Sequence, residues 1–216
     1  RSLPAVVPAL LTLALSAATA RADGDIVLTP KQVAPRTWYF QGEAGMASAL
    51  NKGFMSNAGF VVTTDGVVVF DALGTPALGR AMLAAIRRVT PQPVKRVIVS
   101  HYHADHFYGL AAFKEAGAEI WAHRRAREYL ASDQAGDRLA QRRVDLFPWV
   151  DERTRIVAPD VWLDGDTDFR LGGVTFRVWA GDEKLFERHT DAKVWTPGEV
   201  ALDRFAGREG GLHRGG

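Results

Sequence analysis

The sequence predicts an α/β (α+β) domain, in which helices pack on the outside of a mixed β-sheet. Three observations indicate this class. Short β-branched runs alternate with helical segments, an Asp65-Gly66 turn separates two of these runs, and residues 94–100 form a nearly continuous apolar run. Of the 216 residues, 47% are apolar and 24% are charged, which is sufficient for one domain with a buried core.

The first predicted elements after residue 40 are a β-hairpin and a helix. The runs GFVV and GVVVF flank Asp65-Gly66, and glycine tolerates the positive φ that a tight turn requires. A helix is predicted over residues 75–89. Thr75 is a suitable N-cap, Pro76 suits the first helical position, and two arginines near the end complement the helix dipole.

The other elements continue the alternation of strand and helix. The run at 94–100 is apolar on both faces, which is typical of a strand buried on both sides. The 124–147 segment is rich in arginine, and it has two interpretations: an anion-binding surface or, as its interleaved acids indicate, the solvated face of a helix. The remaining expected elements are a strand at 37–40, a short helix at 109–117, a strand at 119–123, and strands with a Gly172-Gly173 bend over 160–179.

Composition excludes several classes of protein. The net charge is +2 with acids and bases scattered along the chain, so we expect no nucleic-acid partner. The chain has no cysteine, which excludes disulfides, a thiolate nucleophile and cysteine-based zinc sites. Ser100 lacks the G-x-S-x-G context of a serine nucleophile. A small-molecule substrate is the expected partner.

Residues 1–22 have the layout of a secretory signal. An arginine precedes an apolar run, and small residues follow it up to a cleavage site expected after Ala22. A buried or membrane helix is the alternative, but Pro4 and Pro8 interrupt the run. We therefore expect a periplasmic or secreted protein whose mature form, with no later apolar segment of about 20 residues, does not span a membrane.

The segment RVIVSHYHADHFYGL, residues 96–110, holds the strongest functional signal. Directly after the buried strand, it contains His101, His103, Asp105 and His106. In an extended or loosely turned loop, side chains two residues apart project the same way, so His101 and His103 can converge on one ion. Asp105 and His106 lie further along the loop and can reach a second ion. Imidazole nitrogen and carboxylate oxygen suit Zn²⁺ best, with Fe or Mn as further candidates.

HYHADH resembles the H-x-H-x-D-H motif of the metallo-β-lactamase superfamily, and the likeness extends over about residues 37–179. The resemblance implies an αββα sandwich that is incomplete in its C-terminal half. It also implies two zinc ions, the first held by His101 and His103 and the second by Asp105 and His106. Zinc lowers the pKa of bound water to about 7, and Asp105 would act in catalysis by orienting the resulting hydroxide.

Asp71 and the C-terminal segment leave alternatives open. Asp71 ends the GVVVFD strand, and it is either a support for the metal-binding loop or an ordinary carboxylate at a strand end. Beyond a partial domain at 23–180, the family pattern calls for a Gly-x-x-His-Thr turn, then Gly-Asp, then a last histidine. Here Asp182 precedes His189, and His213 lies in a Gly-rich tail.

Two interpretations of this tail compete. Asp182 and His189 complete the metal site in a rearranged tail, or residues 181–216 are not native family sequence because of truncation or a shifted reading frame. We favour the second interpretation, because local and global signals conflict throughout the tail.

The sequence thus supports three functional hypotheses. The first is an exported zinc-dependent hydrolase that cleaves an ester, thioester, lactam or similar bond. The second is a metal- or partner-binding protein of the same fold without turnover, and the third is an inactive truncated or frameshifted remnant. No motif identifies the substrate, because selectivity lies in the walls of the pocket.

Overall fold

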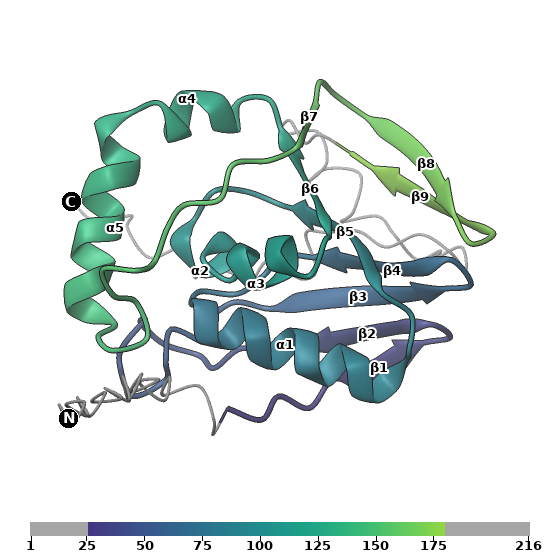
Figure 1. Cartoon of the computed structure of the whole chain (residues 1–216), viewed down its shortest axis with the longest axis horizontal. Coiled ribbons are helices and arrows are strands. Elements are labelled where there is room, and N and C mark those ends of the chain that lie inside the picture. The colour runs from purple at the N-terminus through teal and green to yellow at the C-terminus, as the bar shows by residue number, and fades with distance from the viewer. Residues whose placement is uncertain (1–25, 180–216) are drawn as a thin grey trace, which may run out of the picture.

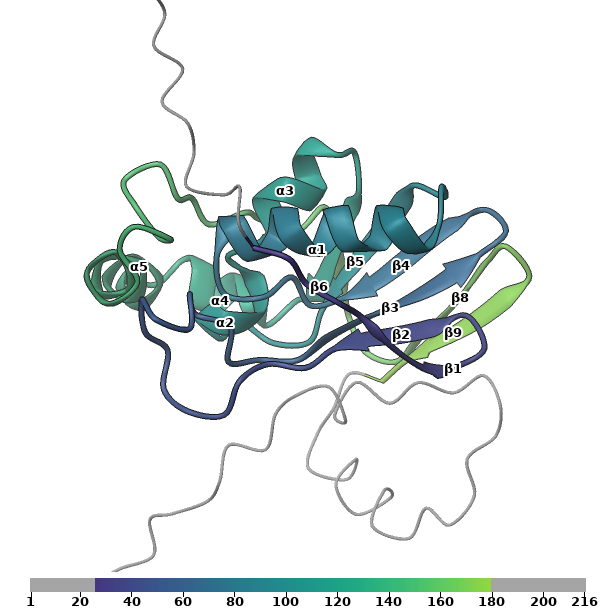
Figure 2. The ribbon, with the colours of Figure 1, turned by 90° about the horizontal axis from the view of Figure 1, so that it is seen from below.

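The computed structural model describes residues 26–179, and every structural statement below concerns these residues. A seven-stranded mixed sheet forms the centre of the molecule, with helices α1 (Pro76–Val89) and α3 (Leu110–Glu115) on one face and a two-stranded hairpin on the other (Figures 1 and 2). The expected signal segment at 1–22 and the tail at 181–216 lie outside the described residues. The predicted α/β class is confirmed.

The seven strands of the main sheet stand in the same order as in the chain. Neighbours from β1 to β4 pair antiparallel, and neighbours from β4 to β7 pair parallel. The strands of the main sheet are β1 (Lys31–Ala34), β2 (Thr37–Phe40), β3 (Ala58–Thr63), β4 (Gly66–Phe70), β5 (Val94–Val99), β6 (Glu119–His123) and β7 (Val161–Leu163). The separate hairpin consists of β8 (Thr167–Leu171) and β9 (Val174–Val178).

Local sequence signals account for the hairpin and the first helix. β3 and β4 pair antiparallel across the Asp65-Gly66 turn, where Gly66 has a φ of 146°. The Thr75 side chain caps α1 by accepting a hydrogen bond of 3.2 Å from the Leu78 amide, and Pro76 is the first helical residue. Both predictions are confirmed.

One prediction was wrong, and one strand was not predicted. The expected continuous helical stretch at 124–147 is two helices, α4 (Ala126–Leu130) and α5 (Asp133–Asp145). The break falls at Ser132, whose extended backbone (φ −92°, ψ 155°) begins the second helix. Strand β1 was not predicted, because its four residues are all exposed and show no apolar alternation.

The main sheet separates two apolar cores. Val67 and Val69 of β4 face α1 in the larger core, whereas Val68 and Phe70 face the β8–β9 hairpin in the smaller one. Alternate residues of a strand point to opposite faces, so a strand that is buried along its whole length supplies both cores. Each such side chain contributes about 1.5–3 kcal/mol through burial.

Arg96 of β5 binds the hairpin to the main sheet. Its guanidinium lies 3.7 Å from the centroid of the Trp121 ring and 4.3 Å from that of Phe169, which belongs to β8. Burial lowers the pKa of Arg96, while Glu119 acts to raise it through an ion pair. The two ring centroids are 5.1 Å apart and the guanidinium lies over both rings, so it gains cation–π attraction from each and joins the hairpin to the main sheet.

Two glycines bring helix α1 into backbone contact with the segment that follows the histidine motif. A Cβ on Gly109 would lie 1.9 Å from the Ala72 carbonyl oxygen, and one on Gly79 would lie 2.3 Å from the Gly109 carbonyl oxygen. The Ala72 amide also donates to the His106 carbonyl at 2.8 Å. The end of β4 and the motif are therefore held together by the main chain.

Candidate metal centre

The histidine motif lies directly beyond the C-terminal end of β5. Its first half, up to His103, is extended, and its second half forms the one-turn helix α2 (Ala104–Phe107). The sequence-based expectation of a loop is therefore correct only for the first half. Residues in one helical turn crowd closely, which brings the Asp105 and His106 side chains to the same spot as the rings of the first half.

Asp71 is the residue that fixes the motif from the core side. It is 1% exposed, and one carboxylate oxygen, Oδ1, accepts a 2.8 Å hydrogen bond from the Ser100 amide. The other oxygen, Oδ2, accepts from the Ser100 hydroxyl at 2.7 Å and from Nδ1 of His106 at 2.8 Å. Of the two interpretations of Asp71, the geometry supports the one in which it supports the motif.

This network determines which ring nitrogens carry protons. The single Ser100 hydroxyl proton goes to Asp71, so the hydroxyl oxygen accepts from Nδ1 of His101 at 2.9 Å. His106 likewise uses Nδ1 to donate to the Asp71 carboxylate. In the neutral rings, Nε2 of both His101 and His106 is left as a lone-pair donor for a metal ion, as metal ligation requires.

Nε2 of His101 and Nε2 of His106 each lie close to another potential metal ligand. Nε2 of His101 lies 3.0 Å from Nδ1 of His103, and the two rings meet edge to face. Nε2 of His106 lies 3.3 Å from Oδ2 of Asp105. An imidazole lone pair and a carboxylate oxygen at this distance repel each other unless a proton or a metal ion lies between them.

Both pairs fit zinc in chemistry and in spacing. Zn²⁺ binds nitrogen and oxygen at about 2.0–2.1 Å, so two ligands of one tetrahedral ion lie roughly 3.3 Å apart. The separations of 3.0 and 3.3 Å are close to this value. We take the donor set as compatible with one ion at the His101–His103 pair and another at the Asp105–His106 pair.

Neither pair is complete within residues 26–179. No group of three or more His, Asp or Glu side chains in this range is arranged to hold one metal ion. A catalytic zinc ordinarily has three protein ligands and one open position. The further ligands considered from the sequence, Asp182, His189 and His213, lie outside the described residues.

Electrostatics favour a protonated His106 in the second pair and a neutral His101 in the first. Burial and the charge of His106 lower the pKa of His101 to about 4, so this ring is neutral at neutral pH. Burial acts to lower the pKa of His106, but its hydrogen bonds to Asp105 and Asp71 outweigh burial and raise the pKa to about 10. Burial acts to raise the pKa of Asp105, yet the hydrogen bond from His106 keeps it below its usual value.

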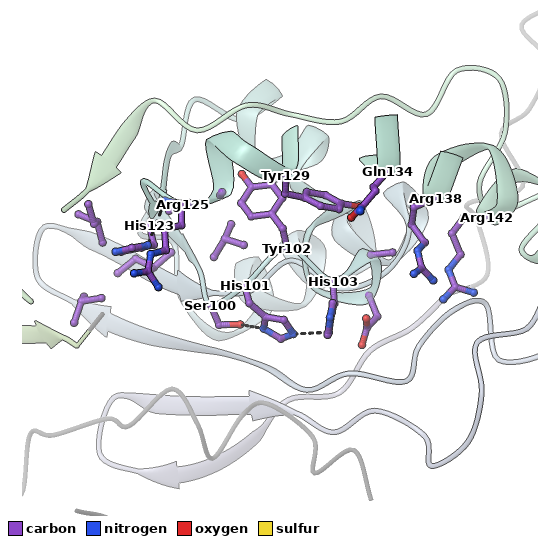
Figure 3. Close-up of a pocket in the computed structure, with 18 of the residues that line it drawn as sticks. Ser100, His101, Tyr102, His103, His123, Arg125, Tyr129, Gln134, Arg138 and Arg142 are labelled. Atoms are coloured by element: carbon purple, nitrogen blue, oxygen red, sulfur yellow. Dashed lines mark hydrogen bonds between the residues drawn. The ribbon is translucent and has the colours of Figure 1, made fainter. Parts of the chain in front are cut away.

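The motif forms the floor of a cavity of about 790 Å³, shown in Figure 3. The ends of β5, β6 and β7 contribute one side, and α4 and α5 form the opposite wall. Met46 and Met55 from the loop at 45–59 also line the cavity, and the Ser56 hydroxyl hydrogen-bonds the Asp105 carbonyl. This loop therefore flanks the site.

Sequence reasoning missed several residues of the site. Ser100 was considered only as a nucleophile, although its place between a buried strand and the motif was a signal for a supporting role. The α5 arginines Arg138 and Arg142 line the cavity, although the favoured interpretation of their stretch was a solvated helix face and an anion-binding surface was the alternative. Helical periodicity does not show which face of a helix meets a cavity.

Comparison with known proteins agrees with this fold. The family model described as "Metallo-beta-lactamase superfamily" matches residues 51–200, a range that includes Asp182 and His189 and ends before His213. The chain therefore belongs to the metallo-β-lactamase superfamily. A curated mouse protein, "Metallo-beta-lactamase domain-containing protein 1", is 33% identical over 97 residues, which cover 44% of this chain and 35% of the mouse protein. The chain thus spans about a third of the length of this relative.

Solved structures show the same fold at low identity. The stereoselective inverting sec-alkylsulfatase Pisa1 from Pseudomonas sp. superposes with a TM-score of 0.51 and 20% identity, covering 70% of this chain and 27% of the sulfatase. The metallo-β-lactamase GOB-18 from Elizabethkingia meningoseptica gives a TM-score of 0.50 and 18% identity, covering 72% of this chain and 52% of that enzyme.

No helix within residues 26–179 is long and apolar enough to cross a membrane.

Proposed function

We propose that this chain is an exported, zinc-dependent hydrolase that cleaves an ester, thioester, lactam or similar bond. The observation that carries the proposal is that donor atoms lie in two close pairs on the floor of the cavity, His101 with His103 and Asp105 with His106. The buried carboxylate of Asp71 orients the His106 ring directly and the His101 ring through Ser100. Membership in a superfamily with hydrolase relatives supports the reaction class.

Each residue of the motif has a distinct role in this proposal. His101 and His103 would hold one ion, and Asp105 and His106 the other. Zinc bound there would polarise the scissile bond and lower the pKa of water at the site. The Asp105 carboxylate faces the cavity, where it can accept a proton from attacking water and return it to the leaving group.

The metal content of the purified full-length chain tests this proposal. We expect two zinc ions per chain in the wild type, and loss of about one in His103→Ala. His123→Ala is the matched control, because His123 lines the same cavity from β6 without belonging to the motif. A folded wild-type chain that binds no zinc, Fe or Mn would refute the metal centre and would favour the inactive remnant.

A metal-binding protein without turnover is the second candidate. The described residues supply two protein ligands for each ion, one fewer than the three that a catalytic zinc ordinarily has, and this favours the second candidate. A panel of chromogenic esters, thioesters and lactams separates the two candidates. Turnover that a chelator abolishes and zinc restores supports the hydrolase, and a zinc-loaded chain that is silent across the panel supports binding alone.

The proposal of export rests on residues 1–22, in which an arginine is followed by an apolar run and then by small residues. Mass spectrometry of the protein recovered from a periplasmic fraction tests it. A mature N-terminus at Asp23 is the expected result, and retention of residues 1–22 in the cytoplasmic fraction would contradict export.

A further inference from the structure

The cavity is basic at both ends. Arg125 lines one end beside His123, Arg138 and Arg142 line the other, and among the described lining residues Asp105 is the single acid. Asp105 is already matched by His106 at 3.3 Å. The cavity therefore carries an excess of positive charge beside the proposed metal centre.

The arginines of residues 124–143 divide into two groups by their contacts. In the first group, Arg127 stacks on Trp162, Arg124 pairs with Asp164 at 2.7 Å, and Arg143 donates to the Asp151 and Thr154 carbonyl oxygens. These three stabilise the fold, and none of them lines the cavity.

The second group consists of the three arginines that line the cavity. Within residues 26–179, the guanidinium groups of Arg125 and Arg138 make no hydrogen bond or ion pair. Arg142 donates one hydrogen bond to Asp145 at 3.2 Å, which occupies one of its five N–H groups. Most of the N–H groups of these three arginines are thus available to a ligand.

Arg138 and Arg142 lie one helical turn apart on α5, and in Figure 3 their guanidinium groups extend in the same direction. In that view they stand at one end of the row of labelled residues, beyond His103, and His123 and Arg125 stand at the other end. Neighbouring guanidinium groups repel each other, and an anion that accepts from both relieves the repulsion while gaining charge-assisted hydrogen bonds.

The middle of the cavity is suited to an apolar group. The rings of Tyr102 and Tyr129 lie between the two basic ends, with centroids 6.1 Å apart. Met46 and Met55 line the same space. Aromatic rings and thioethers together form a surface that packs against a flat or branched apolar body.

We propose that the cavity selects an organic anion, held by Arg138 and Arg142 through its carboxylate, sulfate or phosphate group, with its apolar body against Tyr102 and Tyr129. This inference rests on the proposed function, since it names the substrate class of that site. The arginines and the motif line the same cavity, so a substrate held by its anion extends along the floor that carries the metal centre.

Titration calorimetry of the full chain with benzoate and with the neutral, isosteric benzamide tests the proposal. The titrations are made at low ionic strength, in both chelator-treated and zinc-loaded protein, so that binding to zinc is separated from binding to the arginines. We expect benzoate to bind the chelator-treated chain at least about tenfold more tightly than benzamide does, and added salt to reduce this difference.

Two variants locate the binding. Arg138→Gln is expected to weaken benzoate about tenfold and to leave benzamide unchanged. Arg170→Gln removes the same charge from exposed strand β8, outside the cavity, and should alter neither ligand. Phenyl sulfate and phenyl phosphate, titrated alongside, rank the three anion types.

The possible outcomes separate this inference from the proposed function. Equal affinity for benzoate and benzamide, or equal effects of Arg138→Gln and Arg170→Gln, would overturn the anion site even in a chain that binds zinc and turns over esters. Conversely, a chain without zinc or turnover that still discriminates benzoate through Arg138 would retain the anion site and lose the hydrolase.

Discussion

The two ends of the histidine motif differ in how the fold holds them. His106 is 4% exposed and donates to the buried carboxylate of Asp71, which also binds Ser100. His103 is exposed, and within the described residues its side chain hydrogen-bonds only His101. Under the proposed function, the buried end would serve both folding and chemistry, whereas the exposed end would serve ligand binding alone. Substitutions at each end should separate these two contributions.

The largest effect is expected from Asp71→Ala. This substitution leaves the Ser100 amide, the Ser100 hydroxyl and Nδ1 of His106 without their acceptor in a buried place. We expect the free energy of unfolding, measured by urea denaturation, to fall by about 3–5 kcal/mol, as for other buried pairs that lose one partner.

A control separates this loss from backbone strain. Asp71 has a φ of 60°, which non-glycine residues other than Asn and Asp rarely adopt, so alanine is also disfavoured there. Glycine adopts a positive φ freely, so Asp71→Gly removes the carboxylate without this strain. If Asp71→Gly keeps the stability of the wild type, the role of Asp71 as an anchor of the motif is wrong.

An intermediate effect is expected from Ser100→Ala. The hydroxyl links Asp71 to Nδ1 of His101, so its removal frees that ring without disturbing the Asp71–His106 bond. We expect a loss of about 0.5–1.5 kcal/mol in stability and roughly 10- to 100-fold weaker zinc binding. Ser100→Thr, which retains the hydroxyl, should restore zinc affinity, and failure of both expectations would remove Ser100 from the site.

The smallest effect on stability is expected from His103→Ala. Its ring is exposed and makes no hydrogen bond to the core, so thermal or urea unfolding of the metal-free chain should change by no more than about 0.5 kcal/mol. Zinc content is the sensitive measurement for this variant. A loss of several kcal/mol in the metal-free state would show that the exposed end also supports the fold.

The elements that could be predicted from the sequence are those governed by local chemistry. Asp65-Gly66 specifies its turn by itself, and Thr75 with Pro76 specifies the start of α1, because the atoms that decide each structure are within a few residues. Strand β5 was recognisable because a short run that is apolar on both faces is typical of a strand covered on both sides of the sheet.

The parts that could not be predicted depend on contacts between distant segments. Asp71 and His106 meet across 35 positions of sequence, and the tautomer of the His106 ring follows from that contact. The position of Arg138 at the cavity depends on α5 turning one face toward it, which its periodicity does not reveal. The motif and its grouping into His101 with His103 and Asp105 with His106 were expected from the sequence, whereas the one-turn helix α2, which places Asp105 against His106, was not.

The order of strands in the main sheet has a consequence for how the molecule assembles. Every strand from β1 to β7 lies beside its predecessor in the chain, so no later strand has to insert between two that already pair. The antiparallel β3–β4 pair closes over residues 64–65, whereas the parallel β6–β7 pair closes over residues 124–160. Loop closure therefore costs the least entropy in the antiparallel part of the sheet, whose last strand, β4, is followed directly by Asp71.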